Sequence, residues 1–191
     1  TFIQGNRCQR CSLPLISEQG TCLRCRERSY HFIKHSALFR YKGIPKELIY
    51  YYKFKKKYSL ARLFSRLVHQ EILNKYKDVP IIPVPSREGM IFTKKENHLN
   101  PLIKRLKKDY HRRIISCLVR KGRIPQKTLS FQERVQNLRG NISMKKSMLQ
   151  GIEQVILFDD IFTTGATADE CSRVLQENGV TTIYSVSIAI D

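Results

Sequence analysis

The chain has 191 residues, 41% of them hydrophobic, which is enough for one full core and a small additional module. No apolar run reaches the length of about 18 residues that a membrane-spanning helix needs, and residues 1–5 do not resemble the start of a signal peptide, so we expect neither. Lys and Arg number 35 against 16 Asp and Glu, a net charge of +19, which favours a polyanionic partner, nucleic acid before a membrane surface; a general solubility charge is the alternative.

Four cysteines near the N-terminus form two Cys-x-x-Cys pairs with ten residues between them: Cys8, Cys11, Cys22 and Cys25. Four thiolates at this spacing fit a closed, structural, tetrahedral Zn²⁺ site. Disulfides are the alternative, but without a secretion signal reduced thiols are favoured. We predict a small zinc ribbon in residues 1–35 and a main domain in residues 36–191.

A segment rich in aromatic residues and lysines follows a predicted strand over residues 36–43. A helix is expected from Ile44 to Lys57, with Pro45 in its first turn and lysines in its last. Aromatic rings among cations suit single-stranded nucleic acid, and the candidate contacts are Lys53, Lys55, Lys56 and Lys57. The alternative is that half of the rings are core and the lysines are a solvated face.

The middle of the chain alternates predicted helices and strands. Apolar spacing predicts helices over residues 60–76 and 97–108 and a buried strand over residues 114–119. A short proline-rich strand over residues 79–84 runs into a polar loop that begins with Ser86 and Arg87.

The C-terminal segment predicts a strand, a loop, a helix and a second strand. Residues 155–158 are all apolar, as in a central strand covered on both faces, and Asp159 and Asp160 come at its carboxyl end, where open α/β sheets bind ligands. Thr163, Thr164, Gly165, Ala166 and Thr167 then open a helix, and its first N–H groups favour a phosphate. Gly179 is the expected helix stop and residues 181–190 the next strand. The alternative is an ordinary strand-to-helix turn.

This window resembles the PRPP (5-phosphoribosyl-1-pyrophosphate) motif of type I phosphoribosyltransferases. The order of motifs along the chain is similar to that of the ComF family of competence-related proteins. The motifs are the four cysteines, Tyr41-x-Gly43, Lys53-Phe54, Leu60-Ala61, Pro83-Val84-Pro85, Gln126-x-x-Leu129 to Asn137, and the PRPP window.

The resemblance implies an α/β fold: a type I phosphoribosyltransferase-like parallel sheet flanked by helices, with a zinc ribbon at its N-terminus. It also implies that Asp159 and Asp160 bind ribose hydroxyls, that residues 163–167 bind the 5′-phosphate, and that Ser86 and Arg87 begin the pyrophosphate loop, with Mg²⁺ on the pyrophosphate. The family's usual Arg-Gly-Phe-Asn-Gln is replaced here by Lys94-Lys95-Glu96-Asn97-His98.

The resemblance further implies a role in natural transformation, in the cytoplasm or at the inner face of the inner membrane, with single-stranded DNA and proteins of the uptake or recombination machinery as partners. Two alternatives stay open. One is an active phosphoribosyltransferase of the nucleobase-salvage or amidophosphoribosyl type, and the other is a DNA-binding module on an inert fold.

Overall fold

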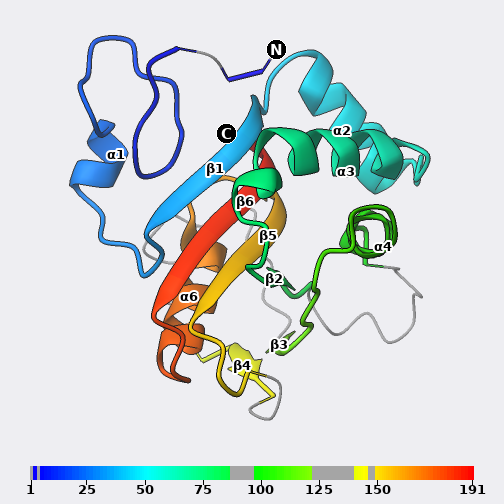
Figure 1. Cartoon of the computed structure of the whole chain (residues 1–191). Helices are drawn as coiled ribbons and strands as arrows, with labels where there is room; N and C mark the ends of the chain where they lie inside the picture. Colours follow the sequence, from blue (N-terminus) through cyan, green and yellow to red (C-terminus); the bar gives the residue numbers. More distant parts are fainter. Residues whose placement is uncertain (1, 4, 87–96, 122–139, 146–148) are drawn as a thin grey trace.

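A parallel four-stranded sheet forms the centre of the computed structural model, which describes residues 2, 3, 5–86, 97–121, 140–145 and 149–191 (Figure 1). Its strand order is β1-β6-β5-β2. The bounds are β1 (Lys34–Arg40), β6 (Thr182–Ile190), β5 (Gln154–Phe162) and β2 (Ile81–Pro83). The predicted parallel α/β sheet is confirmed, since all three strand pairs are parallel.

The two inner strands are covered on both faces. Residues Val155 to Phe158 of β5 have no exposed surface, and their side chains alternate between two apolar clusters. Val155 and Leu157 belong to one cluster, Ile156 and Phe158 to the other. An uninterrupted apolar run is what such a strand needs, because both faces lie against protein.

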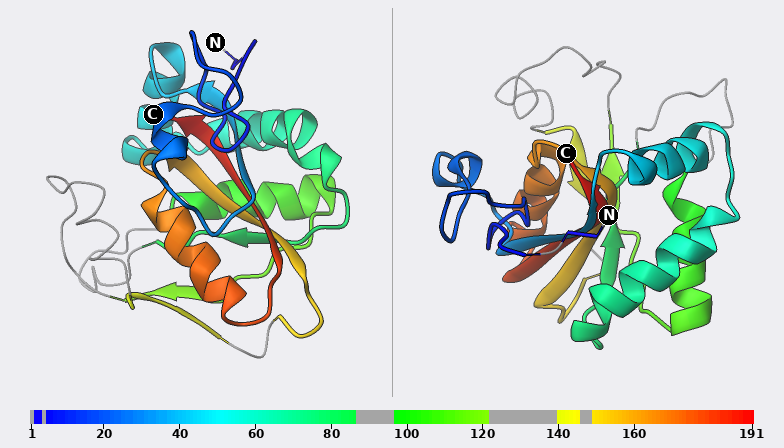
Figure 2. Two further views of the ribbon diagram at one scale, coloured as in Figure 1. Left: turned by 90° about the vertical axis from the view of Figure 1, so that its left-hand side faces the viewer. Right: turned by 90° about the horizontal axis from the view of Figure 1, so that it is seen from above.

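Helices cover the two faces unequally (Figure 2). On one face lie α2 (Ile44–Phe54), α3 (Leu60–Glu71) and α4 (Leu99–Tyr110). On the other lie α6 (Ala166–Gln176) and a cysteine module, residues 5–33, which contains the one-turn helix α1 (Leu23–Arg26).

Most predicted elements differ from the structure by a few residues, as in α2, which was expected to reach Lys57 but ends at Phe54, and two differ more. The helix expected over residues 60–76 ends at Glu71 and is followed by a 3-10 turn, η1 (Leu73–Lys75). The buried guanidinium of Arg112 donates hydrogen bonds to the carbonyl oxygens of Leu73 and Tyr76, so a tertiary partner holds the turn that follows Glu71.

The strand expected over residues 114–119 was also wrong. Ile114 makes a single parallel bridge to Ile81, and β3 (Leu118–Arg120) then pairs antiparallel with β4 (Ile142–Met144) outside the main sheet. Pro83, the last residue of β2, has no N–H to donate, so the ladder on that edge cannot extend past the bridge between Ile81 and Ile114.

The C-terminal unit is a βαβ crossover, as predicted. β5 and β6 are parallel neighbours and α6 connects them. Gly179, at φ +94°, stops the helix: its N–H bonds to the carbonyl of Gln176, and the N–H of Val180 bonds to that of Leu175. Over the described residues, every helix is too short or too polar to cross a bilayer.

Candidate functional site

A cleft of about 290 Å³ opens at the carboxyl edge of the sheet, between the ends of β2 and β5. The two strands hold the loop after β2 beside the acids of β5, because the N–H of Val84 bonds to the carbonyl of Phe158 at 2.9 Å. Asp159, Asp160, Thr167 and Ser86 therefore border one cavity, although they come from three segments of the chain. The remaining lining residues are Lys53, Val84, Pro85, Asn97, His98, Leu99 and Arg120.

Two side chains, from α2 and from the start of α4, contact the carboxylate of Asp160. Its Oδ2 lies 2.6 Å from Lys53 Nζ, on α2, and 2.5 Å from His98 Nε2, just before α4. Although burial opposes ionisation, the hydrogen bond from His98 and the charge of Lys53 hold the pKa of Asp160 well below its usual range. Asp160 is thus a fixed carboxylate.

Asp159 has the opposite character. Burial, and then the negative charge of Asp160, raise the pKa of Asp159 to about 7. At neutral pH this side chain exchanges between a carboxylic acid and a carboxylate, so it both donates and accepts hydrogen bonds. A sugar hydroxyl also does both, and the pair therefore suits two neighbouring hydroxyls.

The two acids were predicted at the carboxyl end of the strand, and the strand extends two residues beyond them. β5 continues to Phe162, and the register with β6 runs through Asp159 opposite Ser187 and Phe162 opposite Ile190. Consecutive strand residues point to opposite faces. Asp160 consequently faces α2 and α4, and Asp159 reaches the same cleft from the side of α6.

The loop of residues 163–167 leads directly into α6. Gly165 is its N-cap residue at φ +82°, and Ala166 is the first helical residue. The first amides of a helix have no intrahelical acceptor and lie at the positive end of its dipole, so they favour an anion. Thr167, in the first turn, is the part of this loop that lines the cleft, whereas Thr163 is exposed and Gly165 and Ala166 are buried.

The four candidate nucleic-acid lysines separate into two groups. Lys55, Lys56 and Lys57 are exposed just beyond the end of α2. Lys53 does not belong to that surface, because its ammonium is bound to Asp160 and its side chain is only 20% exposed. Exposed rings accompany the other three lysines: Tyr50, Tyr51 and Phe54 are 45%, 48% and 64% exposed.

The four N-terminal cysteines lie together, all buried and unbridged, with their sulfur atoms within 4.8 Å of one another. Cys11 Sγ and Cys22 Sγ are 3.6 Å apart. Tetrahedral zinc with Zn–S bonds of about 2.3 Å separates its sulfurs by about 3.8 Å, so the cluster fits this ion. A hydrogen bond from the Cys25 thiol lowers the pKa of Cys11 to about 5, and the same bond raises the pKa of Cys25.

Some predicted positions lie outside the described residues. These are Arg87 of the expected pyrophosphate loop, the segment from Lys94 to Glu96, and the motif from Gln126 to Asn137.

The cleft also contains residues that sequence reasoning missed. His98 had no local signal for its role, because its partner lies 62 positions away in the sequence. The fully buried Tyr52 donates from its hydroxyl to the carbonyl of His98 and so positions it. Lys53 could have been assigned: it follows Ile49 by four residues and so shares the helix face that Ile49 and Tyr52 bury.

Comparison with known proteins gives matches over most of the chain. The chain is 28% identical over 184 residues to the DNA utilization protein YhgH of Escherichia coli O6:H1, covering 92% of this chain and 80% of that protein. It is 24% identical over 157 residues to the competence protein ComFC of Streptococcus pneumoniae, covering 82% and 68%. A solved hypoxanthine phosphoribosyltransferase from Staphylococcus aureus matches at 18% identity and a TM-score of 0.39, over 68% of this chain and 62% of that one.

No family model matches the chain. The two sequence matches nevertheless cover 82% and 92% of the chain, and one of the two proteins is named ComFC, which agrees with the family that the order of motifs resembles. The predicted resemblance to the ComF family is therefore confirmed, and the chain is a homologue of competence and DNA-utilization proteins over most of its length.

Proposed function

We propose that the cleft binds a phosphoribosyl compound such as PRPP and that the protein handles single-stranded DNA in a competence-related role. The observation that supports the sugar site most directly is the convergence of Asp159, Asp160, Thr167 and Ser86 on one cleft. Relatives named for competence and for DNA utilization support the wider role.

The chemistry of the two acids fits the ribose of such a ligand. A ribose offers adjacent 2′- and 3′-hydroxyls, each both donor and acceptor. Asp159, with its pKa of about 7, can donate a hydrogen bond to a hydroxyl or accept one from it, whereas the ionised Asp160 can only accept. Lys53 already pairs with Asp160, so a ligand hydroxyl joins or displaces an existing contact, and the ammonium is close enough to the cleft to meet a phosphate.

The start of α6 is the counterpart for the 5′-phosphate. The helix has 11 residues, long enough for a dipole, and Thr167 brings a hydroxyl to the cleft beside the first amides, of which that of Ala166 already bonds to Thr164 Oγ1 at 3.4 Å. Mg²⁺ would enter on the pyrophosphate of the ligand and balance its charge. Ser86 borders the same cleft on the side where the pyrophosphate would lie.

The exposed end of α2 is the surface proposed for single-stranded DNA. Tyr50 lies against Phe54 with ring centroids 5.2 Å apart, and both rings are open to solvent. Lysines that follow directly supply cations for the backbone, and solvent-exposed rings supply stacking surfaces for bases. This surface adjoins the cleft, because Lys53, which belongs to the same helix, lines the cleft.

Calorimetric titration with PRPP, with and without Mg²⁺, tests the sugar site. We expect saturable binding that the Asp159→Asn variant weakens about tenfold, because the amide offers one neutral acceptor oxygen where the carboxylate offers two charged ones. Asp109→Asn is the matched control, since Asp109 is an exposed acid on α4 that pairs with Arg105. No saturable binding, or equal affinity in both variants, contradicts the proposal.

Asp159 is the better of the two acids for this test. Asp160 is ion-paired and buried, and removal of one partner of a buried pair costs stability by itself, about 3–5 kcal/mol when the pair is fully buried. Ribose 5-phosphate and pyrophosphate titrated separately then show which half of the ligand the cleft holds. Release of pyrophosphate in the presence of a nucleobase would instead support an active transferase.

A further inference from the structure

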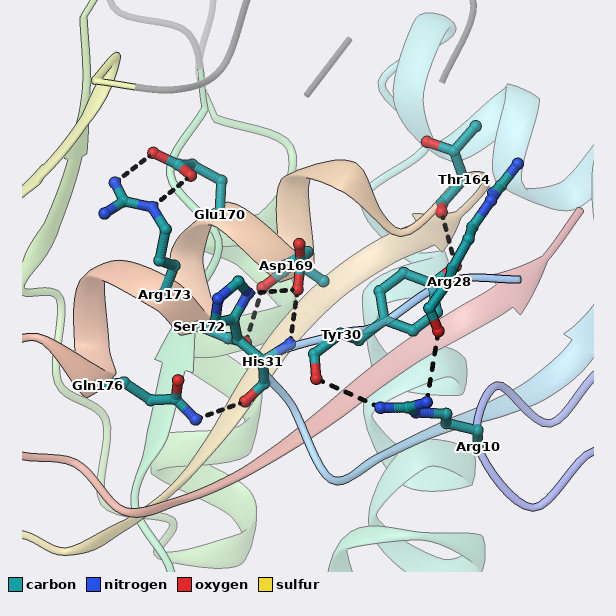
Figure 3. Close-up of polar contacts among 11 residues, drawn as sticks. Arg10, Arg28, Tyr30, His31, Thr164, Asp169, Glu170, Ser172, Arg173 and Gln176 are labelled. Carbon is teal, nitrogen blue, oxygen red and sulfur yellow. Dashed lines mark hydrogen bonds and ion pairs between the residues drawn. The ribbon is translucent and has the colours of Figure 1, made fainter. Parts of the chain in front are cut away.

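The backbone of loop 163–167 is held from outside by the cysteine module. Arg24 donates from Nη1 to the carbonyl oxygen of Thr163 at 2.8 Å. The hydroxyl of Tyr30 donates to the carbonyl oxygen of Thr164 at 3.1 Å (Figure 3). Both acceptors are main-chain atoms of the segment proposed to receive the phosphate. The two donors are more than 130 positions away in the sequence.

Arg24 connects this loop with the cysteine cluster itself. It lies between Cys22 and Cys25, and its Nη2 is 4.0 Å from Cys11 Sγ. Its helix, α1, has only four residues, too few to be stable alone. The position of the guanidinium therefore depends on what fixes the cysteines.

A second arginine occupies the same place in the first cysteine pair. Arg10 precedes Cys11 as Arg24 precedes Cys25, so both pairs read Cys-x-Arg-Cys. Arg10 donates to the carbonyl oxygens of Arg28 and Tyr30, at 3.3 and 3.5 Å, and its guanidinium carbon is 5.8 Å from the centre of the Tyr30 ring (Figure 3). One arginine thus contacts the loop directly, and the other holds the tyrosine that contacts it.

The contact between module and loop is close-packed. A Cβ atom added at Gly165 would lie 2.9 Å from Tyr30 Cε1, so the loop backbone lies directly against that ring. The next residue, His31, is fastened to α6: its N–H and its ring bond to Asp169, at 2.6 and 2.9 Å, and its carbonyl accepts from Gln176 at 2.8 Å (Figure 3). The loop and the first turns of α6 therefore share one support.

We propose that the cysteine module is a positioning device for loop 163–167, in which Arg24 and Tyr30 set the loop backbone and metal occupancy of the four cysteines sets Arg24. This inference rests on the proposed phosphosugar site. Zinc in the module would then raise the affinity for a phosphorylated sugar without touching it. Arg24 and Tyr30 are positioning residues, since their contacts are to main-chain carbonyls of the loop.

The test uses the full chain and two readouts. The variants are Tyr30→Phe, which keeps the ring and removes the hydroxyl, and Arg24→Gln; Arg26→Gln is the matched control, because Arg26 is in the same turn but donates to Thr21. We expect each test variant to retain one zinc per chain, to bind PRPP about 3- to 10-fold more weakly, and to exchange the amide hydrogens of residues 163–169 faster. The control should match the unchanged protein in all three.

Removal of zinc with a chelator should accelerate exchange in residues 163–169 before it does so in β5 or β6. If PRPP does not bind at all, the proposed function fails, while the exchange experiment still decides the positioning role. Exchange in residues 163–169 that is unchanged in Tyr30→Phe, in Arg24→Gln and after zinc removal would overturn the inference.

Discussion

Lys53 Nζ lies 2.6 Å from Asp160 Oδ2, so one lysine of a strongly basic segment is turned into the sheet edge while its neighbours face solvent. The Lys53→Met variant keeps the length of the side chain but removes its charge. Because His98 still contacts Asp160, we expect a loss of about 1–3 kcal/mol in the free energy of unfolding, less than for a fully broken buried pair. Urea unfolding measures this loss in the free energy of unfolding. Lys57→Met, at an exposed position, should stay within about 0.5 kcal/mol of the unchanged protein; equal losses in both would show that the ion pair is not stabilising.

The salt dependence of single-stranded DNA binding should distinguish the three exposed lysines from Lys53. Replacement of Lys55, Lys56 and Lys57 by Gln removes up to three phosphate contacts, and the slope of log affinity against log salt should become shallower by about 2. Lys53→Gln should leave the slope unchanged, because that ammonium is bound to Asp160. Fluorescence anisotropy at several salt concentrations measures both. A slope that responds to Lys53 and not to the exposed lysines would remove the end of α2 from the DNA surface.

The parts of the fold that could be predicted have local causes. The apolar run of residues 155–158 indicates a strand covered on both faces whatever surrounds it, and Gly179 ends α6 through its own positive φ. The four cysteines could be assigned to one metal site because two Cys-x-x-Cys pairs at this spacing are typical of such sites.

The parts that could not be predicted depend on distant partners. The helix over residues 60–76 was overextended because Arg112 engages the carbonyls after Glu71, and no pattern within the helix reveals this. His98 joins the cleft only because Tyr52 and Asp160 come to it from other elements. In the same way, Asp159 and Asp160 have different pKa values because the fold gives a cationic partner to one of them.

Both the backbone conformation and the close packing at position 165 favour glycine, and a matched pair of variants separates the two effects. Its φ is +82°, and a Cβ there would lie 2.6 Å from Phe162 Cζ and 2.9 Å from Tyr30 Cε1. Gly151, at φ +74°, has no atom within 4 Å of such a Cβ. Gly151→Ala should cost about 1–2 kcal/mol for backbone strain, and Gly165→Ala about 1–3 kcal/mol more for overpacking. Thermal unfolding compares them; if the two variants are equally stable, the ring contacts yield without cost.

His35 should make the fold sensitive to acid. It is fully buried on β1 between the hydroxyls of Ser185 and Ser187, at 2.9 and 3.1 Å, and stacks on Phe162. Burial, and then the charge of Arg24, lower the pKa of His35 to about 3. The unfolded chain takes up this proton near pH 6.5 and the folded chain only near pH 3, so the contribution of His35 to stability is complete above pH 6.5 and is lost as pH falls toward 3.

One proton of difference corresponds to about 1.4 kcal/mol per pH unit. His35→Gln should be less stable than the unchanged protein at pH 7, because it loses the stacking contact with Phe162. The difference in stability between the two proteins should shrink as pH falls from 6 to 4, because only the unchanged protein loses the contribution of the neutral imidazole. Asp159 also titrates in this range with the opposite sign, because its raised pKa favours the folded state as pH falls from 7, but it is common to both proteins and cancels in the comparison. Urea unfolding at pH 7, 6, 5 and 4 measures the difference, with His31→Gln as the control at a partly exposed histidine. A difference that stays constant over this range would mean that His35 is protonated as easily in the folded chain as in the unfolded one.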